Sequence, residues 1–249
     1  MRIPLIKSFT SLLLVCLTGL AQANNANQSI QNVEQYLGQE DRMEDKSKDS
    51  SRKPVELVWA LGITPGMVVL DLGAGGGYSS EIFSVAVGEK GKVYAQNDQA
   101  TVNLFDGKYV KPLSLRTQNN RLPNVDVVVW ELEDLPLAGQ VDVAYWGLSM
   151  HDQLGKDEAK VVEMLKTIHN ALKPGGVLVV VDHIGDENQD NAKLHRIAPS
   201  RIDRLLAQAG FKNPQTSDLY RNDQDKHNLV VFDPSVAGKT DRYFVKVTK

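Results

Sequence analysis

A run of closely spaced glycines constrains the fold of this chain more than any other feature. Residues 66–80 read Gly-Met-Val-Val-Leu-Asp-Leu-Gly-Ala-Gly-Gly-Gly-Tyr-Ser-Ser. The apolar start of this stretch, from Met67 to Leu70, is typical of a buried parallel strand. Helical spacing of apolar residues resumes at Tyr78, so the glycines lie in a tight turn between a strand and a helix. Such a turn offers bare backbone and the positive end of a helix to a ligand.

Segments of strand length alternate with helical segments along the chain. Strands are predicted at residues 67–70, 92–96, 125–132, 141–148, 177–181, 213–219 and 242–248. Helical spacing of apolar residues occurs at residues 30–37, 54–61, 157–172 and 198–210, with a weaker, partly helical stretch at 101–119. This alternation predicts an α/β fold: a doubly wound, mostly parallel sheet with helices on both faces and an antiparallel final pair of strands.

Polar residues follow several of the predicted strands, which is where a sheet of this kind binds its ligands. These residues are Asp71, Asn97, Asp98, Glu131, His151, Asp152, Asp182 and His183. Because the carboxyl ends of parallel strands meet at one edge of the sheet, we expect a binding site to be built from this set.

Two classes of nucleotide ligand use a strand, a glycine turn and a helix. The dinucleotide fingerprint Gly-x-Gly-x-x-Gly fits at Gly73 and Gly75, but its third position holds Tyr78. That departure disfavours a nicotinamide-dependent oxidoreductase. The pattern that does match is Asp-x-Gly-x-Gly-x-Gly, which starts at Asp71 and ends at Gly77. It resembles motif I of the class I S-adenosylmethionine-dependent methyltransferases.

The resemblance covers residues 55–181 and implies a seven-stranded, Rossmann-like methyltransferase sheet with S-adenosylmethionine as cofactor. In this family the second strand ends in an acid for the ribose hydroxyls, whereas this chain has Asn97 there, with Asp98 next to it. Glu131 would accept from the adenine amino group, and Leu132 would offer its backbone. The residues that the resemblance assigns to the cofactor are Asp71, Gly73, Ala74, Gly75, Gly77, Tyr78, Asn97, Asp98, Glu131 and Leu132.

His151 and Asp152 are the predicted catalytic residues, because this superfamily places substrate or catalytic groups after strand four. A histidine there can act as general base for an oxygen or nitrogen nucleophile. The alternative is a histidine that only hydrogen-bonds within its loop. Together with Asp182 and His183, the two residues could form a His/Asp cation site of the kind that some methyltransferases use to acidify a hydroxyl. Because the sequence does not show whether these side chains converge, no metal ligand is assigned and metal binding stays open.

The C-terminal half resembles a narrower group of exported bacterial methyltransferases. The resemblance is carried by His195-Arg196-Ile197 and by residues 231–234 and 238–243. Two interpretations of His195 and Arg196 stay open: they lie on the rim of the pocket, or they form a salt bridge.

The first 23 residues have the organisation of a secretory signal. The basic residues Arg2 and Lys7 precede an apolar stretch at residues 12–20. Ala21-Gln22-Ala23 is a small-x-small cleavage site. The apolar stretch is too short for a stable membrane anchor. Its removal predicts a periplasmic or secreted protein with no stable membrane insertion.

The predicted parts of the chain are a signal peptide at 1–23, an N-terminal leader and helix at 24–53, and a methyltransferase domain at 54–249. The polar residues 24–29 at the start of the leader are expected to be disordered. Cleavage would remove the single cysteine, Cys16, which excludes disulfides and thiolate catalysis from the remaining chain. It would also remove two cations and change the net charge from −3 to about −5, which does not favour a nucleic-acid partner.

We therefore predict an S-adenosylmethionine-dependent methyltransferase that acts on a small molecule. The predicted export creates an alternative, since S-adenosylmethionine is made in the cytosol. The alternative is an exported protein on the same fold that binds S-adenosylmethionine or another nucleoside without transferring a methyl group.

Overall fold

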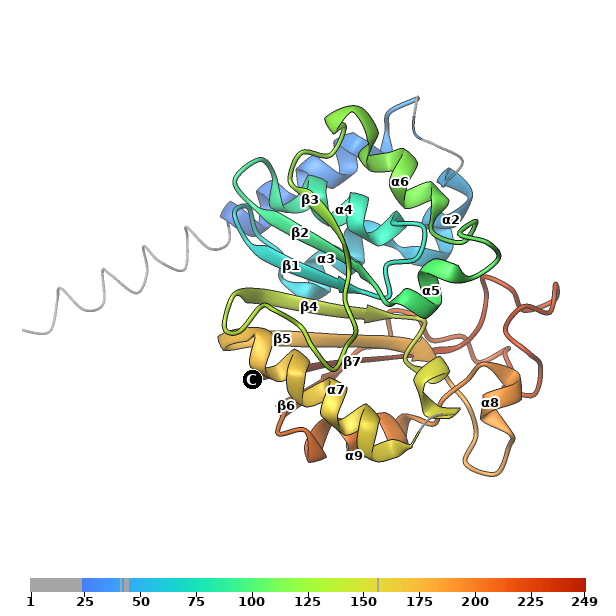
Figure 1. Cartoon of the computed structure of the whole chain (residues 1–249). Helices are drawn as coiled ribbons and strands as arrows, with labels where there is room; N and C mark the ends of the chain where they lie inside the picture. Colours follow the sequence, from blue (N-terminus) through green and yellow to red (C-terminus); the bar gives the residue numbers. More distant parts are fainter. Residues whose placement is uncertain (1–23, 41, 43–44, 156) are drawn as a thin grey trace, which may run out of the picture.

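The structure, a computed structural model, describes residues 24–40, 42, 45–155 and 157–249. One central sheet carries helices on both faces (Figure 1). The strands are β1 (Val68–Leu72), β2 (Lys92–Asn97), β3 (Val125–Val129), β4 (Val141–Gly147), β5 (Leu172–His183), β6 (Lys212–Thr216) and β7 (Arg242–Thr248). The helices are residues 24–37, α2 (Lys46–Arg52), α3 (Pro54–Leu61), α4 (Tyr78–Val87), α5 (Gln99–Asn103), α6 (Lys111–Thr117), α7 (Glu158–Ala171), α8 (Asn191–Leu194) and α9 (Pro199–Gln208), with short 3₁₀ turns at Gln118–Asn120 and His151–Gly155.

The strand order is β3-β2-β1-β4-β5-β7-β6. Strands β1 to β5 pair in parallel, and β7 pairs antiparallel with both β5 and β6. The order reverses between β1 and β4, so the crevice beyond the carboxyl ends of these two strands is the expected ligand site. The predicted doubly wound sheet with an antiparallel final pair is confirmed.

Two apolar clusters cover the two faces of the sheet. Helices α7 and α9 pack on one face through residues such as Leu165 and Leu205, and α3 and α4 pack on the other through residues such as Val58 and Phe83 (Figure 1). Helix α7 forms as predicted because its apolar residues recur at helical spacing and Asp157 caps its first turn by accepting from the Ala159 amide.

The boundaries differ from the sequence prediction by three or more residues at three strands, one of which is β6, which ends at Thr216 rather than at residue 219. β3 ends at Val129, three residues before the predicted boundary, and residues 132–133 form a turn. β5 begins at Leu172 rather than at residue 177, since Leu172 pairs with Val141 across a bulge.

The N-terminal leader corrects one expectation. Residues 24–29, expected to be disordered, are part of the helix at residues 24–37. This helix packs on α4, where Val33 is fully buried and the Ser29 hydroxyl donates to the Ala86 carbonyl at 2.7 Å. The predicted signal peptide lies outside the described residues. Within the described ranges, no helix has the length and apolar character needed to span a bilayer.

Candidate functional site

The glycine turn between β1 and α4 is held open by side chains from the end of β2. Gly73, Gly75 and Gly77 have φ values of 61°, 54° and 79°, in the left-handed region that favours glycine. The Gln96 side-chain carbonyl accepts from the Gly73 amide at 3.0 Å, and the Asn97 side-chain carbonyl accepts from the Gly75 amide at 2.8 Å. These two bonds fix the shape of the glycine loop, residues 73–77, before any ligand arrives.

Neighbouring side chains leave no room for larger residues in this loop. A Cβ added at Gly73 would lie 2.6 Å from Oγ of Ser149, and one added at Gly75 would lie 3.1 Å from the Tyr109 ring. Both neighbours also line the cavity described below. The glycines therefore let the loop approach the cavity wall closely, in addition to allowing its backbone conformation.

Asp71 has a supporting place in the site. Its side chain is buried behind the glycine loop, where it accepts a hydrogen bond of 2.5 Å from the Ser80 hydroxyl in the first turn of α4. Burial raises the pKa of Asp71 to about 7, although the Ser80 hydrogen bond and the charge of Arg52 oppose this rise. The structure thus places Asp71 as an anchor between β1 and α4, away from the cavity wall.

A cavity of about 750 Å³ opens beside the glycine loop at the carboxyl ends of β1, β2, β4 and β5. Its inner wall carries polar side chains from the ends of these strands, and its outer part is aromatic. Phe105 and Phe232, which line the outer part, are 71% and 67% exposed. The volume and the mixed lining suit a ligand with both apolar and polar groups.

Three of the residues assigned to the cofactor line the cavity: Gly73, Asp98 and Leu132. The other seven lie behind or beside its wall. Asn97 is committed to the glycine loop, the Tyr78 hydroxyl donates to Asp49 at 2.8 Å, and Glu131 accepts from the Gln99 amide at 3.1 Å. Ala74, Gly75 and Gly77 form the loop backbone, and Asp71 supports it. Contact between these ten residues and a cofactor stays a prediction.

His151, at the start of the 3₁₀ turn after β4, is fixed by a buried carboxylate from β5. Its Nδ1 lies 2.7 Å from Oδ1 of Asp182, and its backbone amide donates to Oδ2 of the same residue at 2.9 Å. Asp182 is fully buried, so both interactions are shielded from solvent. With Nδ1 facing Asp182, Nε2 of His151 is directed at Asp152 and the cavity.

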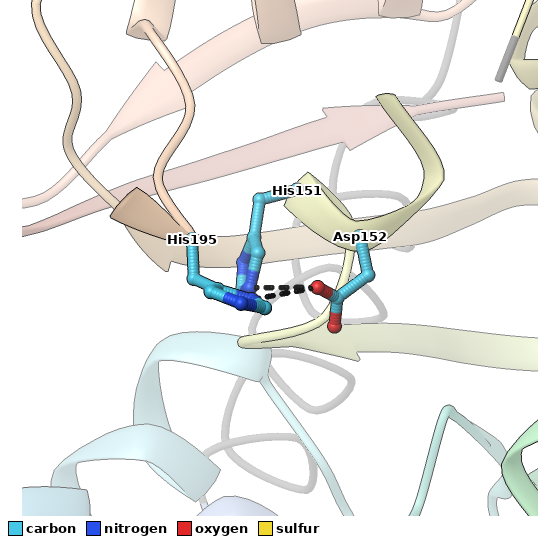
Figure 2. Close-up of side chains that lie close together, drawn as sticks. All are labelled: His151, Asp152 and His195. Carbon is cyan, nitrogen blue, oxygen red and sulfur yellow. Dashed lines mark hydrogen bonds and ion pairs between the residues drawn. The ribbon is translucent and has the colours of Figure 1, made fainter. Parts of the chain in front are cut away.

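Asp152 lies between two imidazole rings (Figure 2). Its Oδ1 is 3.3 Å from Nε2 of His151 and 3.0 Å from Nδ1 of His195. Burial opposes ionisation of Asp152, but hydrogen bonds and charge from the two histidines hold its pKa below the usual range. Burial likewise opposes protonation of His151, but the charges and hydrogen bonds of Asp182 and Asp152 raise its pKa to about 10. His195 thus lies on the cavity wall and also pairs with a carboxylate, so both of its open interpretations apply.

Arg196, by contrast, serves the fold. Its guanidinium is buried and makes a bidentate ion pair with Asp225, at 2.9 and 3.1 Å, and it donates to the carbonyls of Ile184 and Leu229. These bonds tie the segment around residue 225 to the end of β5. The salt-bridge interpretation of Arg196 is confirmed.

His183 lines the cavity next to His151 but differs from it in charge. The two rings are 5.7 Å apart, and Nδ1 of His183 lies 2.7 Å from the Thr240 hydroxyl. Burial, together with the positive charge of Arg242 and other cations, holds the pKa of His183 well below its usual range. His183 is therefore a neutral imidazole in the same wall.

Backbone strain occurs where β4 enters the site. Leu148, which lines the cavity, has a φ of 60°, a conformation that is costly for a bulky residue. The strained residue forms a bend directly before Ser149 and His151, which both line the cavity. Sequence reasoning gave no signal for this bend, because leucine normally favours a continued strand or helix.

Several cavity residues were not singled out from the sequence. They are Gln96, Ala100, Thr101, Leu104, Phe105, Tyr109, Trp146, Gln153, Val231 and Phe232. Val231 and Phe232 fall in the segment 231–234 that carries the narrower resemblance, which was a usable signal. The cavity residues between 100 and 109 carried no such signal in the sequence, since only the folding of α5 and of the segment after it brings them to the site.

Comparison with known families supports the sequence resemblance. A family model described as "Methyltransferase domain" matches residues 63–215, which is more than half of the chain. No curated protein sequence is close enough to count as a match.

Solved structures with the same fold include several methyltransferases. A SAM-dependent methyltransferase from Aquifex aeolicus is 23% identical, with a TM-score of 0.60 over 82% of this chain and 95% of that one. Phosphoethanolamine N-methyltransferase 2 of Haemonchus contortus, solved with S-adenosyl-L-methionine, is 14% identical, with a TM-score of 0.55 over 80% of this chain and 52% of that one. The cyclase SpnF is 16% identical, with a TM-score of 0.54 over 82% and 80% of the two chains. Since one of these relatives is named as a cyclase, the shared fold by itself does not identify the reaction.

Proposed function

This chain belongs to the methyltransferase domain family, and on that premise we propose that it transfers a methyl group from S-adenosylmethionine to a small acceptor. The observation that carries the proposal is the cavity of about 750 Å³, which joins the glycine loop to the pair His151 and Asp152. A cofactor held at the loop and an acceptor held at the pair would share one enclosed space.

The residues at the glycine loop fit an adenosyl cofactor. When bound, S-adenosylmethionine would supply a sulfonium methyl group whose carbon an acceptor attacks in line, with the thioether as the leaving group. Gly73 presents bare backbone to the cavity, at the entry to the N-terminus of α4. Asp98 caps α5 through Oδ1, which accepts from the Thr101 amide at 2.6 Å. A carboxylate has a second oxygen, which is suited to a ribose hydroxyl, and Leu132 adds an apolar surface for adenine.

At the other side of the cavity, the chain offers groups for positioning an acceptor and for taking up its proton. The carboxylate of Asp152 is half exposed to the cavity, and the buried Asp182 keeps His151 oriented toward it. Because the raised pKa of His151 keeps its ring protonated near neutral pH, the ionised carboxylate of Asp152 is the group that can accept the proton of an acceptor hydroxyl or amine, and His151 holds that carboxylate in place. Orientation and exclusion of water would supply most of the remaining rate acceleration.

The proposal is tested by binding and turnover together. Calorimetry of the purified protein with S-adenosylmethionine, with its demethylated product and with NAD should show binding of the first two only. A methyl-transfer screen with phenols, amines and small carboxylic acids should then find an acceptor whose methylation falls by about 100-fold in His151→Ala, because the ring holds Asp152 and hence the acceptor in position. If neither S-adenosylmethionine nor its demethylated product binds, the proposal is overturned.

A second candidate is an exported protein that binds S-adenosylmethionine or a related nucleoside without turnover. The signal-like organisation of residues 1–23 favours it, because S-adenosylmethionine is made in the cytosol. Binding of S-adenosylmethionine with no methylated acceptor in the screen would favour this candidate.

Export itself is a proposal that a mass measurement tests. Expression of the full chain in a bacterium with a periplasm should yield a mature protein that begins at Asn24 in the periplasmic fraction. A cytoplasmic product that retains Met1 would contradict the proposed periplasmic or secreted location.

A further inference from the structure

One group of three histidine and carboxylate side chains among the described residues converges closely enough to hold a metal ion. It consists of His151, Asp152 and His195, whose ligand atoms all lie within 4.8 Å of one another. Figure 2 shows the two imidazoles approaching one carboxylate oxygen from the 3₁₀ turn after β4 and from the end of α8. Asp152 and His195 are 43 residues apart in the chain, so the fold brings the group together.

The separations between the ligand atoms match those around a coordinated ion. Nitrogen and oxygen ligands lie about 2.1 Å from a transition-metal ion, so two neighbouring ligands are about 3.0–3.4 Å apart in octahedral or tetrahedral geometry. The Oδ1 atom of Asp152 is 3.3 Å from Nε2 of His151 and 3.0 Å from Nδ1 of His195. Both edges that include the carboxylate therefore have the length that a shared ion requires.

The surroundings of His151 are those of a metal-binding histidine. The ring nitrogen that faces away from the group is 2.7 Å from the buried carboxylate of Asp182. Metal-ligating histidines usually donate that second N–H to a carboxylate or carbonyl, which fixes the tautomer and makes the ligating nitrogen more basic. Asp182 also binds the His151 backbone amide, so the ring has little freedom to turn away.

A second observation points to a ligand at the same place. The side-chain carbonyl oxygen of Gln153, next to Asp152, is buried and has no hydrogen-bond partner within the part of the chain that the structure describes. Gln153 lines the same cavity as the three candidate ligands. A buried carbonyl oxygen without a donor is costly, and a metal-bound water or hydroxyl would satisfy it.

We propose that His151, Asp152 and His195 form a binding site for a divalent first-row transition-metal ion, such as Zn²⁺ or Fe²⁺, in the acceptor half of the cavity. Two imidazoles and one carboxylate suit these ions, whereas Mg²⁺ and Ca²⁺ prefer oxygen ligands throughout. Three protein ligands leave positions open toward the cavity for water or for an oxygen atom of the acceptor.

The site deepens the proposed function, on which its role in catalysis rests. An acceptor hydroxyl bound to the ion loses its proton to solvent more readily, because the ion lowers the pKa of a coordinated oxygen. The resulting oxygen lone pair forms the new bond to the methyl carbon, and the carbon–sulfur bond breaks with its electrons remaining on sulfur. The favoured acceptors are then hydroxyl compounds with an apolar body, which the aromatic outer part of the cavity would contact.

Cobalt binding to the full chain tests the site directly. Metal-free protein, prepared by dialysis against a chelator, is titrated with Co²⁺ and followed by visible absorption, which reports nitrogen and oxygen ligands around the ion. One equivalent should produce the absorption band, Zn²⁺ should displace it, and a large excess of Mg²⁺ should leave it in place. No band above that of free Co²⁺ would overturn the proposal.

Three variants separate the site from incidental binding. His195→Ala and Asp152→Asn should each weaken Co²⁺ binding by at least 100-fold, and both should fold because the two side chains are 38% and 50% exposed. His169→Ala, in α7 with its ring against Phe211, is the matched control and should bind Co²⁺ like the unaltered protein. Equal Co²⁺ affinity in His195→Ala and in the control would overturn the proposal.

Calorimetry with S-adenosylmethionine keeps the two proposals distinguishable. If the metal-free protein binds S-adenosylmethionine but gives no Co²⁺ band, the metal site is wrong and the proposed function stands. If Co²⁺ binds and S-adenosylmethionine does not, the metal site stands and the proposed function is wrong.

Discussion

Single residues set the shape of the glycine loop, and Gly75 is the clearest case. Its φ of 54° is unfavourable for any residue with a Cβ, and an added Cβ would press on the Tyr109 ring at 3.1 Å. Its amide is held by Asn97 at 2.8 Å, so the loop cannot relax without losing a buried hydrogen bond. Both backbone conformation and local space therefore require glycine here.

Gly75→Ala should weaken S-adenosylmethionine binding by at least tenfold, since the loop must move to admit the methyl group. Calorimetry measures the effect. Gly139→Ala is a matched control: its φ of 64° gives the same backbone strain, about 1–2 kcal/mol, but no atom lies within 4 Å of an added Cβ. Gly139→Ala should lower stability without changing affinity. Equal affinities in the two variants would contradict a role for bare backbone at residue 75.

Asp71 makes a pH-dependent contribution to stability. An aspartate in the unfolded chain has a pKa near 3.8, whereas burial raises that of Asp71 in the folded protein to about 7. Between these two values the folded state binds more protons than the unfolded state, so stability falls as the pH rises from about 4 to about 7 and this contribution is constant above that. A difference of three pKa units corresponds to about 4 kcal/mol.

Asp71→Asn removes this titration and keeps an oxygen for Ser80. The difference in unfolding free energy between the variant and the unaltered protein should favour the variant by a few kcal/mol more at pH 8 than at pH 4.5. Urea unfolding of both proteins at the two pH values measures the change. Parallel pH dependences would show that Asp71 ionises in the folded protein as readily as in the unfolded chain.

At the scale of elements, α6 connects the glycine loop to the N-terminal part of the chain. Arg116 of α6 is buried and pairs with Glu81 of α4 and with Asp45, the residue before α2. Its Nε also donates to the Gly76 carbonyl at 2.8 Å. The Arg116 side chain thus joins α6, α4, Asp45 and the glycine loop.

Arg116→Met should destabilise the protein by about 3 kcal/mol, because the buried carboxylates of Glu81 and Asp45 keep only their more exposed partners, Arg121 and Lys48. Arg204→Ala is the comparison: Arg204 pairs with Glu158 on the surface, where such pairs contribute about 0–1 kcal/mol. Urea unfolding at pH 7 measures both. A loss below 1 kcal/mol in Arg116→Met would mean that Lys48 and Arg121 alone are sufficient partners for Asp45 and Glu81.

The elements also show what could be predicted from the sequence and what could not. The strands and the long helices were found because apolar periodicity is a local signal, as in α7 and β4. The pairing of Asp182 with His151 could not be predicted from the sequence, since it depends on the register of β4 against β5. Asn97 was placed correctly at the end of β2, but its bond to Gly75 rather than to a ribose depends on how closely two loops approach.

At the scale of the whole molecule, the described residues between 24 and 53 are part of the folded structure around the site. The Tyr36 hydroxyl binds Glu81, and Asp49 accepts from the Tyr78 hydroxyl at 2.8 Å. Both partners lie in α4, directly after the glycine loop. The division of the chain into a leader and a separate domain at residue 54 therefore cuts through one network of buried contacts.

A chain that begins at Asn24 should fold and bind S-adenosylmethionine, whereas one that begins at Pro54 should lose much of both. The shorter chain lacks the fully buried Val33, which contributes about 1.5–3 kcal/mol, and leaves Glu81 and Arg116 with fewer partners beside the glycine loop. Thermal unfolding and calorimetry compare the two chains at equal concentration. Because the loop is fixed on one side by β2 and on the other by these N-terminal contacts, affinity should fall by more than tenfold even where the shorter chain remains folded. An unchanged affinity in a folded Pro54 chain would show that the β2 contacts alone determine the shape of the loop.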